Sequence, residues 1–244
     1  MEAPDLRRIL TGLLALLFLT CPSRGEVVQA AGDDAAARIL AAAGSQSQAW
    51  DKLAWLTDRI GPRLSGSPGH EAAVRWAVAQ FGRDGADRAW TEKVMVPHWI
   101  RGVETGSIVA PVVAPMAITA LGRSEPTPEG GITAEVIEVS SIDELKAVAG
   151  KVPGKIVLFN LPILPNGGEA HGYGAGAALR HDGGVEAAKL GAVGALIRSL
   201  GTAAFRRPHT GMTEYAEGVA RIPYAAISQE DADHIHRFLA AGET

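Results

Sequence analysis

The sequence has only one cysteine, Cys21, and few aromatic residues, which make up 5% of its 244 positions. Because Cys21 lies at the edge of an apolar N-terminal run, a mature chain that begins beyond it contains no cysteine. Such a chain has no intramolecular disulfide, no thiolate nucleophile and no cysteine-bound zinc. Basic runs are also absent, because 27 acidic residues face 23 basic ones and no run of Lys and Arg exceeds a pair. We therefore expect no nucleic-acid surface.

The N-terminus has the pattern of a secretory signal peptide. Arg7 and Arg8 precede the apolar residues 9–20, a run shorter than the roughly 20 residues needed to cross a bilayer. Residues at the −3 and −1 positions suit cleavage after Gly25 or after Ala30. We expect residues 1–30 to be a signal, and the mature protein to be secreted or periplasmic without membrane attachment. An apolar helix of a cytosolic protein is the alternative.

Cys21 also stands where a lipoprotein would carry its modified thiol. Such processing prefers a leucine and then a small residue immediately before the cysteine. Residues 18–20, Phe-Leu-Thr, fit this preference poorly. A lipid anchor is therefore not expected.

Helical spacing dominates the first third of the chain. Apolar residues recur at i, i+4, i+7 and i+11 over 48–60, and a second apolar stripe runs over 68–83. The alanine-rich segment 33–43 also favours a helix, and it is either a pro-segment or the first helix of the domain. The apolar alternation at 94–96 predicts a strand, which the following proline would end.

The stretch GPRLSGSPG, residues 61–69, begins like a phosphate-binding loop. Such a loop follows a strand and carries a lysine, whereas here a helix precedes it and Ser67 and Pro68 stand at the diagnostic positions. No serine lies in the G-x-S-x-G context of a nucleophile. We predict instead a helix stop followed by a new helix, with Ser67 as its N-cap and Pro68 at its first position.

A second domain is predicted beyond the turn-rich residues 102–131, with a boundary near Gly106. Strands are expected at 132–139, 155–161, 191–197 and 222–227, and helices at 184–190 and after Ser228. Residues 106–241 therefore predict a small α/β domain.

The seven histidines form no recognisable metal motif. His70 has no second histidine four residues on, so H-E-x-x-H fails. His234 and His236 are two residues apart on a predicted helix, which predicts surface positions on different faces. His171 and His181 flank the glycine-rich HGYGAGAALRH, which we expect to be a loop that either folds over a ligand or is simply exposed to solvent.

The motif PHTG at 208–211 is the strongest remaining candidate for a binding loop. Two arginines precede it, and Glu214 and Tyr215 follow it closely, which is typical of a loop that contacts substrate. A solvent-exposed turn is the alternative. We take His209 and Tyr215 as candidate substrate-proximal residues.

Several blocks, in order, resemble the N-terminal half of the carboxypeptidase Q-like (plasma glutamate carboxypeptidase-like) family of two-zinc exopeptidases. They are IGPRLSGSPGHEAAVRW, VMVPHWIRG, GGITAEVIEV, GKIVLFN, GGVEAAKLGAVGALIRSL, PHTGMTEYAEGVARIPYAAIS and EDADHI. The resemblance covers residues 48–241. It implies that residues 31–105 are the incomplete first segment of an α/β zinc-peptidase domain. It also implies that residues 106–241 are a protease-associated domain inserted into that domain.

The resemblance further implies a secreted enzyme that uses two zinc ions to hydrolyse small peptides, with the insert covering the substrate cleft. A homodimer is compatible with it. The family's metal ligands and catalytic glutamate lie in motifs of the kind H-x-D, D-D-G and E-E, none of which occurs in this sequence. Without a zinc pair and a carboxylate to move the proton of water, this mechanism cannot proceed.

We therefore assign no catalytic residue and no metal ligand, and expect this chain alone to bind no zinc and to be inactive. The unpaired first peptidase segment also predicts poor solubility. The alternative is a stand-alone exported protease-associated module that binds a peptide or a partner without catalysis.

Overall fold

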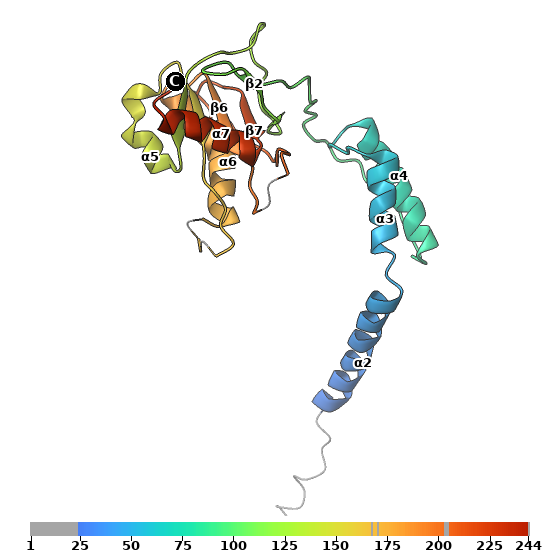
Figure 1. The fold of residues 1–244 in the computed structure, drawn as a ribbon. Helices are drawn as coiled ribbons and strands as arrows, with labels where there is room; N and C mark the ends of the chain where they lie inside the picture. Colours follow the sequence, from blue (N-terminus) through green and yellow to red (C-terminus); the bar gives the residue numbers. More distant parts are fainter. Residues whose placement is uncertain (1–23, 167, 170, 203–204, 244) are drawn as a thin grey trace, which may run out of the picture. The chain divides into compact units, whose positions relative to one another are not determined.

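A computed structural model describes residues 24–166, 168–169, 171–202 and 205–243 (Figure 1). The chain divides into two compact units, an N-terminal unit that ends at Val96 and a C-terminal unit that begins at Pro97. Residues 1–23, which include Cys21 and most of the expected signal, lie outside the described residues. None of the described helices combines the length and the apolar character needed to span a membrane.

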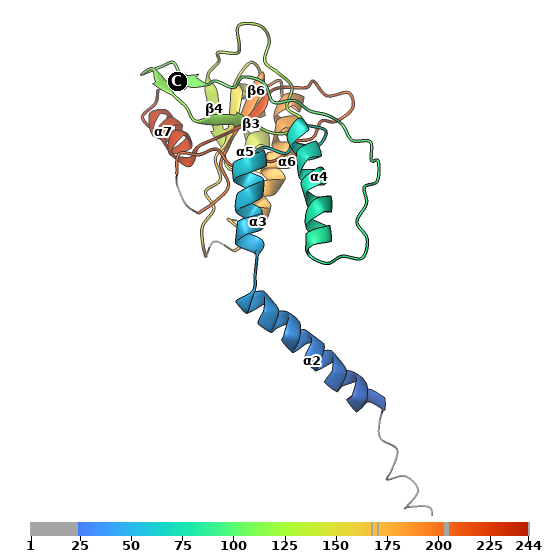
Figure 2. The same ribbon diagram turned by 90° about the vertical axis from the view of Figure 1, so that its right-hand side faces the viewer.

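Helices form the N-terminal unit, as expected. They are α2 (Arg24–Ser45), α3 (Ala49–Trp55), the π-helical turn η1 (Leu56–Ile60) and α4 (Pro68–Arg83), and they confirm the helices predicted over 33–43, 48–60 and 68–83. α3 and α4 lie side by side (Figure 2), with the rings of Trp55 and Trp76 stacked at 5.3 Å. Lys52 Nζ donates to Asp84 Oδ2 at 2.6 Å. No side chain of α3, η1 or α4 is buried.

The stretch 61–69 turns the chain between these helices. Arg63 donates from Nη1 to the carbonyl oxygens of Leu56 and Gly61, at 2.9 and 2.7 Å, so it satisfies carbonyls at the end of the first helix. Ser67 Oγ accepts from the His70 amide at 3.1 Å, which confirms the predicted N-cap. A Cβ at Gly69 would lie 2.1 Å from the carbonyl oxygen of Pro62, so only glycine fits there.

The strand predicted at 94–96 does not form. These residues have no regular secondary structure, and Val94 and Met95 are 73% and 82% exposed. A strand is stable only when its backbone groups pair with a neighbour, and no described segment pairs with this one. Alternation of apolar residues alone was therefore misleading here.

The C-terminal unit is built on a five-stranded sheet in the order β3-β7-β6-β5-β4. β4 (Val136–Val139), β5 (Ile156–Phe159), β6 (Gly194–Arg198) and β7 (Tyr224–Ile227) are mutually parallel, whereas β3 (Ile118–Ala120) runs antiparallel to β7 at one edge. The four parallel strands overlap the four predicted ones, and the α/β class is confirmed. β3 and the short pair β1 (Ser107–Ile108) and β2 (Ala114–Pro115) were not anticipated.

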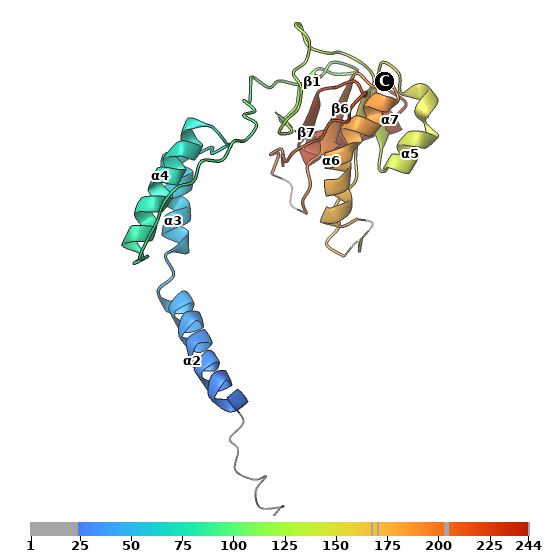
Figure 3. The same cartoon turned by 180° about the vertical axis from the view of Figure 1, so that it is seen from behind.

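Helices cover both faces of the sheet (Figures 1 and 3). On one face, α5 (Ile142–Ala147) and α6 (Tyr173–Lys189) pack on a core that includes Val157, Phe159 and Tyr224. On the other face, α7 (Gln229–Ala240) packs on Leu158 and Leu196. Alternate residues of each strand thus face opposite cores, as the two-residue period of a strand requires.

Helix α6 corrects the loop expected at 171–181. It begins at Tyr173 and runs through the glycine-rich sequence, so the predicted helix 184–190 is only its last part. A Cβ at Gly183 would lie 2.8 Å from Phe159 Cε2, and one at Gly184 would lie 2.8 Å from Tyr224 Cδ1. The glycines therefore let the helix lie close to the sheet, a packing requirement that local helix propensity does not reveal.

The start of α7 confirms the predicted cap. Ser228 Oγ accepts from the Asp231 amide at 3.0 Å and donates to Asp231 Oδ2 at 2.7 Å. The same carboxylate oxygen accepts from the Ala117 amide at 2.7 Å, next to strand β3. Asp231 thus connects the helix to the antiparallel edge of the sheet.

Candidate functional site

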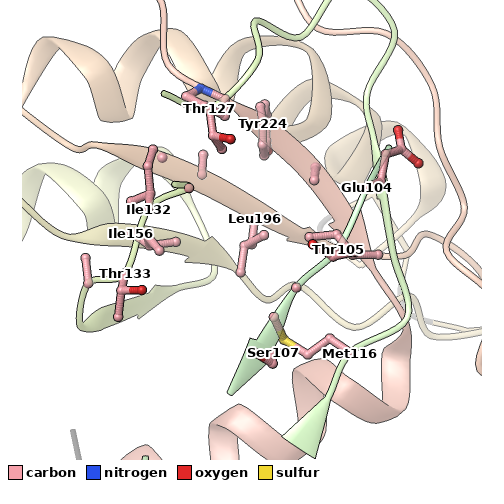
Figure 4. A pocket seen from close by; sticks show the side chains of 18 of the residues that line it. Glu104, Thr105, Ser107, Met116, Thr127, Ile132, Thr133, Ile156, Leu196 and Tyr224 are labelled. Atoms are coloured by element: carbon pink, nitrogen blue, oxygen red, sulfur yellow. The ribbon is translucent and has the colours of Figure 1, made fainter. Parts of the chain in front are cut away.

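A cavity of about 1160 Å³ lies over the α7 face of the sheet (Figure 4). Ile156 of β5 and Leu196 of β6 line it from the sheet, and Met116 lines it beside β2. Segments 99–111 and 123–136 complete the lining together with α7 side chains. The lining of the cavity is therefore mostly apolar, as in sites that bind apolar groups.

The polar groups of this cavity do not form a reaction centre. The carboxylate of Glu104 contacts the Arg101 guanidinium and accepts from the Ala120 amide at 3.0 Å. Threonine and serine hydroxyls also line it, but within the described residues none bonds to a histidine or carboxylate side chain that could act as its base. The described lining thus fits binding better than acid–base or nucleophilic chemistry.

His209 lies in the long connection between β6 and β7, beyond the carboxyl end of β6. Its amide donates to Ser199 Oγ at 2.7 Å, and its Nδ1 contacts the carbonyl oxygen of Leu200. Because a carbonyl oxygen only accepts, Nδ1 carries the proton, so Nε2 is an acceptor, and it has no hydrogen-bond partner within the described residues. His209 also lines a smaller hollow of about 370 Å³ together with Phe205 and Arg207.

Tyr215 has both hydrogen-bonding functions of its hydroxyl occupied. The hydroxyl donates to the Ile222 carbonyl oxygen at 2.9 Å and accepts from the Glu125 amide at 2.8 Å. The Arg221 guanidinium lies 5.4 Å from the centre of its ring. Burial raises the pKa of Tyr215. These contacts hold the loop before β7, and no described hydrogen bond or ring contact joins Tyr215 to His209, so its substrate role stays a prediction.

Two residues that the sequence patterns did not single out lie beside His209. The ring of Tyr173 is 5.9 Å from the ring of His209, and the guanidinium of Arg180 is 5.6 Å from the ring of Tyr173. Tyr173 and Arg180 are seven residues apart on α6, which is the spacing of one helix face. A helical interpretation of 171–181 would have revealed that spacing.

A second polar network lies at the carboxyl ends of the strands. Arg198, at the end of β6, contacts the carboxylate of Asp233 on α7 and donates to Asn160 Oδ1 at 3.3 Å. The Asn160 amide group donates to Glu138 of β4, whose carboxylate also contacts His236. Every member thus has a partner, which is typical of a network that ties α7 to the sheet.

The described residues bring together no group of three His, Asp, Glu or Cys side chains that could hold a metal. His236, whose side chain is 59% exposed, pairs with Glu138 and lies at the surface as predicted, whereas His234 is half-buried and its ring packs against Phe238 at 4.6 Å. His171 lies just before α6, and its Nδ1 contacts the Pro162 carbonyl oxygen. The donor set of this part of the chain therefore does not fit zinc.

Comparison with known proteins identifies close relatives. The chain is 41% identical to human carboxypeptidase Q over 219 residues, which are 89% of this chain and 45% of that protein. It is also 41% identical to mouse carboxypeptidase Q, over 81% of this chain and 40% of the relative. The chain thus spans less than half the length of the curated relatives that it matches. No family model matches the sequence.

A solved structure shares the fold. The chain superposes on a Peptidase M28 precursor from Shewanella amazonensis with a TM-score of 0.80 and 40% sequence identity. The match covers 86% of this chain and 48% of that one. Sequence and fold agree, so the chain belongs to a carboxypeptidase Q-like peptidase family and matches a little under half the length of its relatives.

Proposed function

We propose that these residues are the N-terminal portion of a zinc-dependent exopeptidase or dipeptidase that is exported and hydrolyses the peptide bonds of small peptides. One observation carries the proposal: 41% identity over 89% of the chain to a protein named for carboxypeptidase activity. Identity of this extent supports common ancestry with the relative.

In this proposal residues 31–105 are the first segment of the peptidase domain, and residues 106–241 are the protease-associated insert. The C-terminal unit has a sheet with apolar clusters on both faces, as an inserted domain needs. The N-terminal unit instead exposes large apolar side chains, including Trp50 at 79% and Phe81 at 58%. Such side chains are the expected surface of a domain completed by further chain.

Zinc belongs to the proposed whole enzyme and not to these residues, because the described donor set does not fit the metal. In the whole enzyme, two zinc ions would supply the activation of water. The part proposed for this chain is to receive substrate: His209, whose Nε2 has no hydrogen-bond partner within the described residues, is its candidate contact, and Tyr215 is a second. Dimer formation through the insert belongs to the same proposal.

The proposal is tested first on the gene. Sequencing the genomic DNA beyond codon 244 should reveal, in frame, H-x-D, D-D-G and E-E motifs. The purified 244-residue chain should contain no stoichiometric zinc and show no chelator-sensitive dipeptide hydrolysis. A stop codon with no such motifs downstream, or zinc with activity in the purified chain, would contradict the proposal.

A second candidate function is a stand-alone exported module that binds a peptide or partner without catalysis. It is favoured by the C-terminal unit, whose own buried core includes Leu121, Phe159 and Tyr224 at 1% exposure or less. The unburied helices of the N-terminal unit argue against it, since a binding module gains nothing from them. The protection of these helices against hydrogen exchange distinguishes the two functions.

A further inference from the structure

The segment 84–96, between helix α4 and the C-terminal unit, has an accessible backbone. Each of its residues is exposed, and it contains no helix or strand (Figure 2). Among the described residues, no backbone–backbone hydrogen bond involves residues 87–96. An endopeptidase needs an extended backbone that can enter its cleft, so burial and hydrogen bonding decide where a folded chain is cut. This segment presents neither obstacle.

Two basic residues lie within this segment. Arg88 and Lys93 are exposed, and neither pairs with a carboxylate within the described residues. Alanine follows the first and valine the second, so neither peptide bond involves the rigid ring of proline. Endopeptidases of the trypsin class select a basic residue through an aspartate in their specificity pocket. Both bonds therefore suit that class.

The next basic residue along the chain, Arg101, is held in place. Its Nη1 donates to the Ala120 carbonyl oxygen at 2.8 Å and contacts the Glu104 carboxylate. Glu104 Oε1 also accepts from the Ala120 amide at 3.0 Å. The Arg101 side chain is 29% exposed. We expect it to resist a protease that cuts the preceding segment, because its guanidinium must first leave these contacts.

The contacts within the C-terminal unit do not depend on the segment 84–96. Every member of the two apolar clusters of this unit lies at residue 108 or beyond. Among the described residues, the first hydrogen bond from the start of the unit to the rest of it comes from Trp99, whose Nε1 donates to the Ser124 carbonyl oxygen at 3.1 Å. A cut before residue 97 removes none of these contacts, so the unit should stay folded.

We propose that the segment 84–96 is a processing site at which an endopeptidase of the trypsin class releases the C-terminal unit as a folded module. Water adds across the peptide bond that follows Arg88 or Lys93, leaving a carboxylate on the basic residue and an amino group on the next one. The endopeptidase supplies the catalysis. The module keeps every residue of the candidate functional site, so binding there outlasts release. The proposal concerns the 244-residue chain and does not rest on the proposed function.

Limited digestion of the full 244-residue chain by trypsin tests the site. Samples are taken over time, and intact mass spectrometry with N-terminal sequencing identifies the products. We expect cleavage after Arg88 or Lys93 before any cleavage within residues 97–244, and cleavage after Arg101 only later. The fragment 94–244 should persist at least about tenfold longer than the parent chain, because its folded core limits further opening.

A protease of different specificity separates backbone access from side-chain chemistry. A glutamate-specific endopeptidase should cut first after Glu92, which lies in the same segment. Glu125, in the C-terminal unit, should be cut later although its side chain is 38% exposed, because the chain around it is held by the Glu125 amide bond to Tyr215 and by the ion pair with Arg221.

Variants identify the residues that trypsin recognises. Combining Arg88→Gln with Lys93→Gln should slow release of the unit at least about tenfold, because Arg83, the nearest basic residue before them, lies in the last turn of α4. Arg237→Gln is the matched control. It removes an exposed basic residue within helix α7 and should leave the order of cleavage unchanged.

Early cleavage within residues 97–244 by either protease would overturn the proposal. Loss of the C-terminal unit as fast as the parent chain would do the same, because a released module must survive its release. These outcomes differ from failure of the proposed function, which is decided by the downstream gene sequence and by zinc.

Discussion

Gly184 of helix α6 lies against the ring of Tyr224 in strand β7, where an added Cβ would be 2.8 Å from the ring carbon Cδ1. The ring is almost fully buried, at 1% exposure, and its hydroxyl donates to the Leu179 carbonyl oxygen at 3.0 Å. It therefore has little freedom to move away. The close approach of α6 to the sheet depends on the absence of a side chain at this position.

Gly184→Ala should therefore destabilise the chain, although alanine is the better helix former. Overpacking of a core costs about 1–3 kcal/mol, to be measured as the free energy of unfolding in urea. Gly174→Ala is the matched control, because it lies in the same helix with no atom within 4 Å of its added Cβ. That variant should be up to about 1 kcal/mol more stable than the parent. Equal stability of the two variants would refute this role of Gly184.

The same glycines explain where sequence reasoning succeeded and failed. The caps at Ser67 and Ser228 and the apolar parallel strands depend on neighbours in sequence or on burial of a whole segment, so they could be predicted. Helix α6 could not, because its glycines disfavour a helix locally and are retained for contacts with β5 and β7. The strand predicted at 94–96 was wrong for the opposite reason. Its local pattern favours a strand, but a strand forms only where its backbone pairs with a neighbouring strand.

In the candidate site, too, some residues could be predicted from the sequence and others could not. His209 could be proposed from its loop motif, because PHTG and the residues near it are adjacent in sequence. Arg180 and Tyr173 could not, since their approach to His209 requires both the helical form of α6 and the return of residues 208–211 to that helix. Only the tertiary structure brings these segments together.

Asp231 should be the most costly polar residue to remove from α7. Its carboxylate is 6% exposed and accepts from the Ala117 amide and the Ser228 hydroxyl. Asp231→Ala leaves a backbone amide without its partner and should cost about 2–4 kcal/mol of unfolding free energy. Asp143→Ala, in the exposed first turn of α5, removes a comparable helix-dipole interaction and should cost less than about 1 kcal/mol. Similar losses in a urea titration would contradict the bridging role.

Stability should fall in alkaline solution because of Tyr224. Burial raises the pKa of this tyrosine well above its ordinary value near 10. The contribution of Tyr224 to the free energy of unfolding is therefore fully present below about pH 10, where the tyrosine is neutral in both the folded and the unfolded chain. As the pH rises further, the unfolded chain releases the proton first, so unfolding becomes more favourable by up to about 1.4 kcal/mol per pH unit.

Tyr224→Phe checks this pH dependence. The variant loses the hydrogen bond to Leu179 and should be less stable at neutral pH by about 1 kcal/mol. Its unfolding free energy should nevertheless decline less steeply above pH 10 than that of the parent chain. Tyr215→Phe should show a smaller change in the same direction, since the pKa of Tyr215 is raised by partial burial. Parallel curves for parent and Tyr224→Phe would contradict the assignment.

The N-terminal unit should exchange its amide hydrogens much faster than the C-terminal unit. Helices α4 and α7 allow this comparison within one chain, because they differ in how much of their surface is buried. α7 buries Asp231, Ala232 and Ile235 against the sheet, whereas no residue of α4 is buried. Local opening of a helix is limited mainly by the apolar surface that it buries, so α4 should open with the smaller free energy.

Hydrogen exchange followed by mass spectrometry on the intact 244-residue chain measures this difference. Peptides from 68–83 should exchange at least about tenfold faster than peptides from 229–240, a difference of about 1.4 kcal/mol in opening free energy. Equal protection would mean that the N-terminal helices close a core of their own, which would favour the stand-alone binding module. Fast exchange of α4 alone supports an incomplete peptidase segment, because such a segment leaves its apolar face without a partner until the rest of the domain is present.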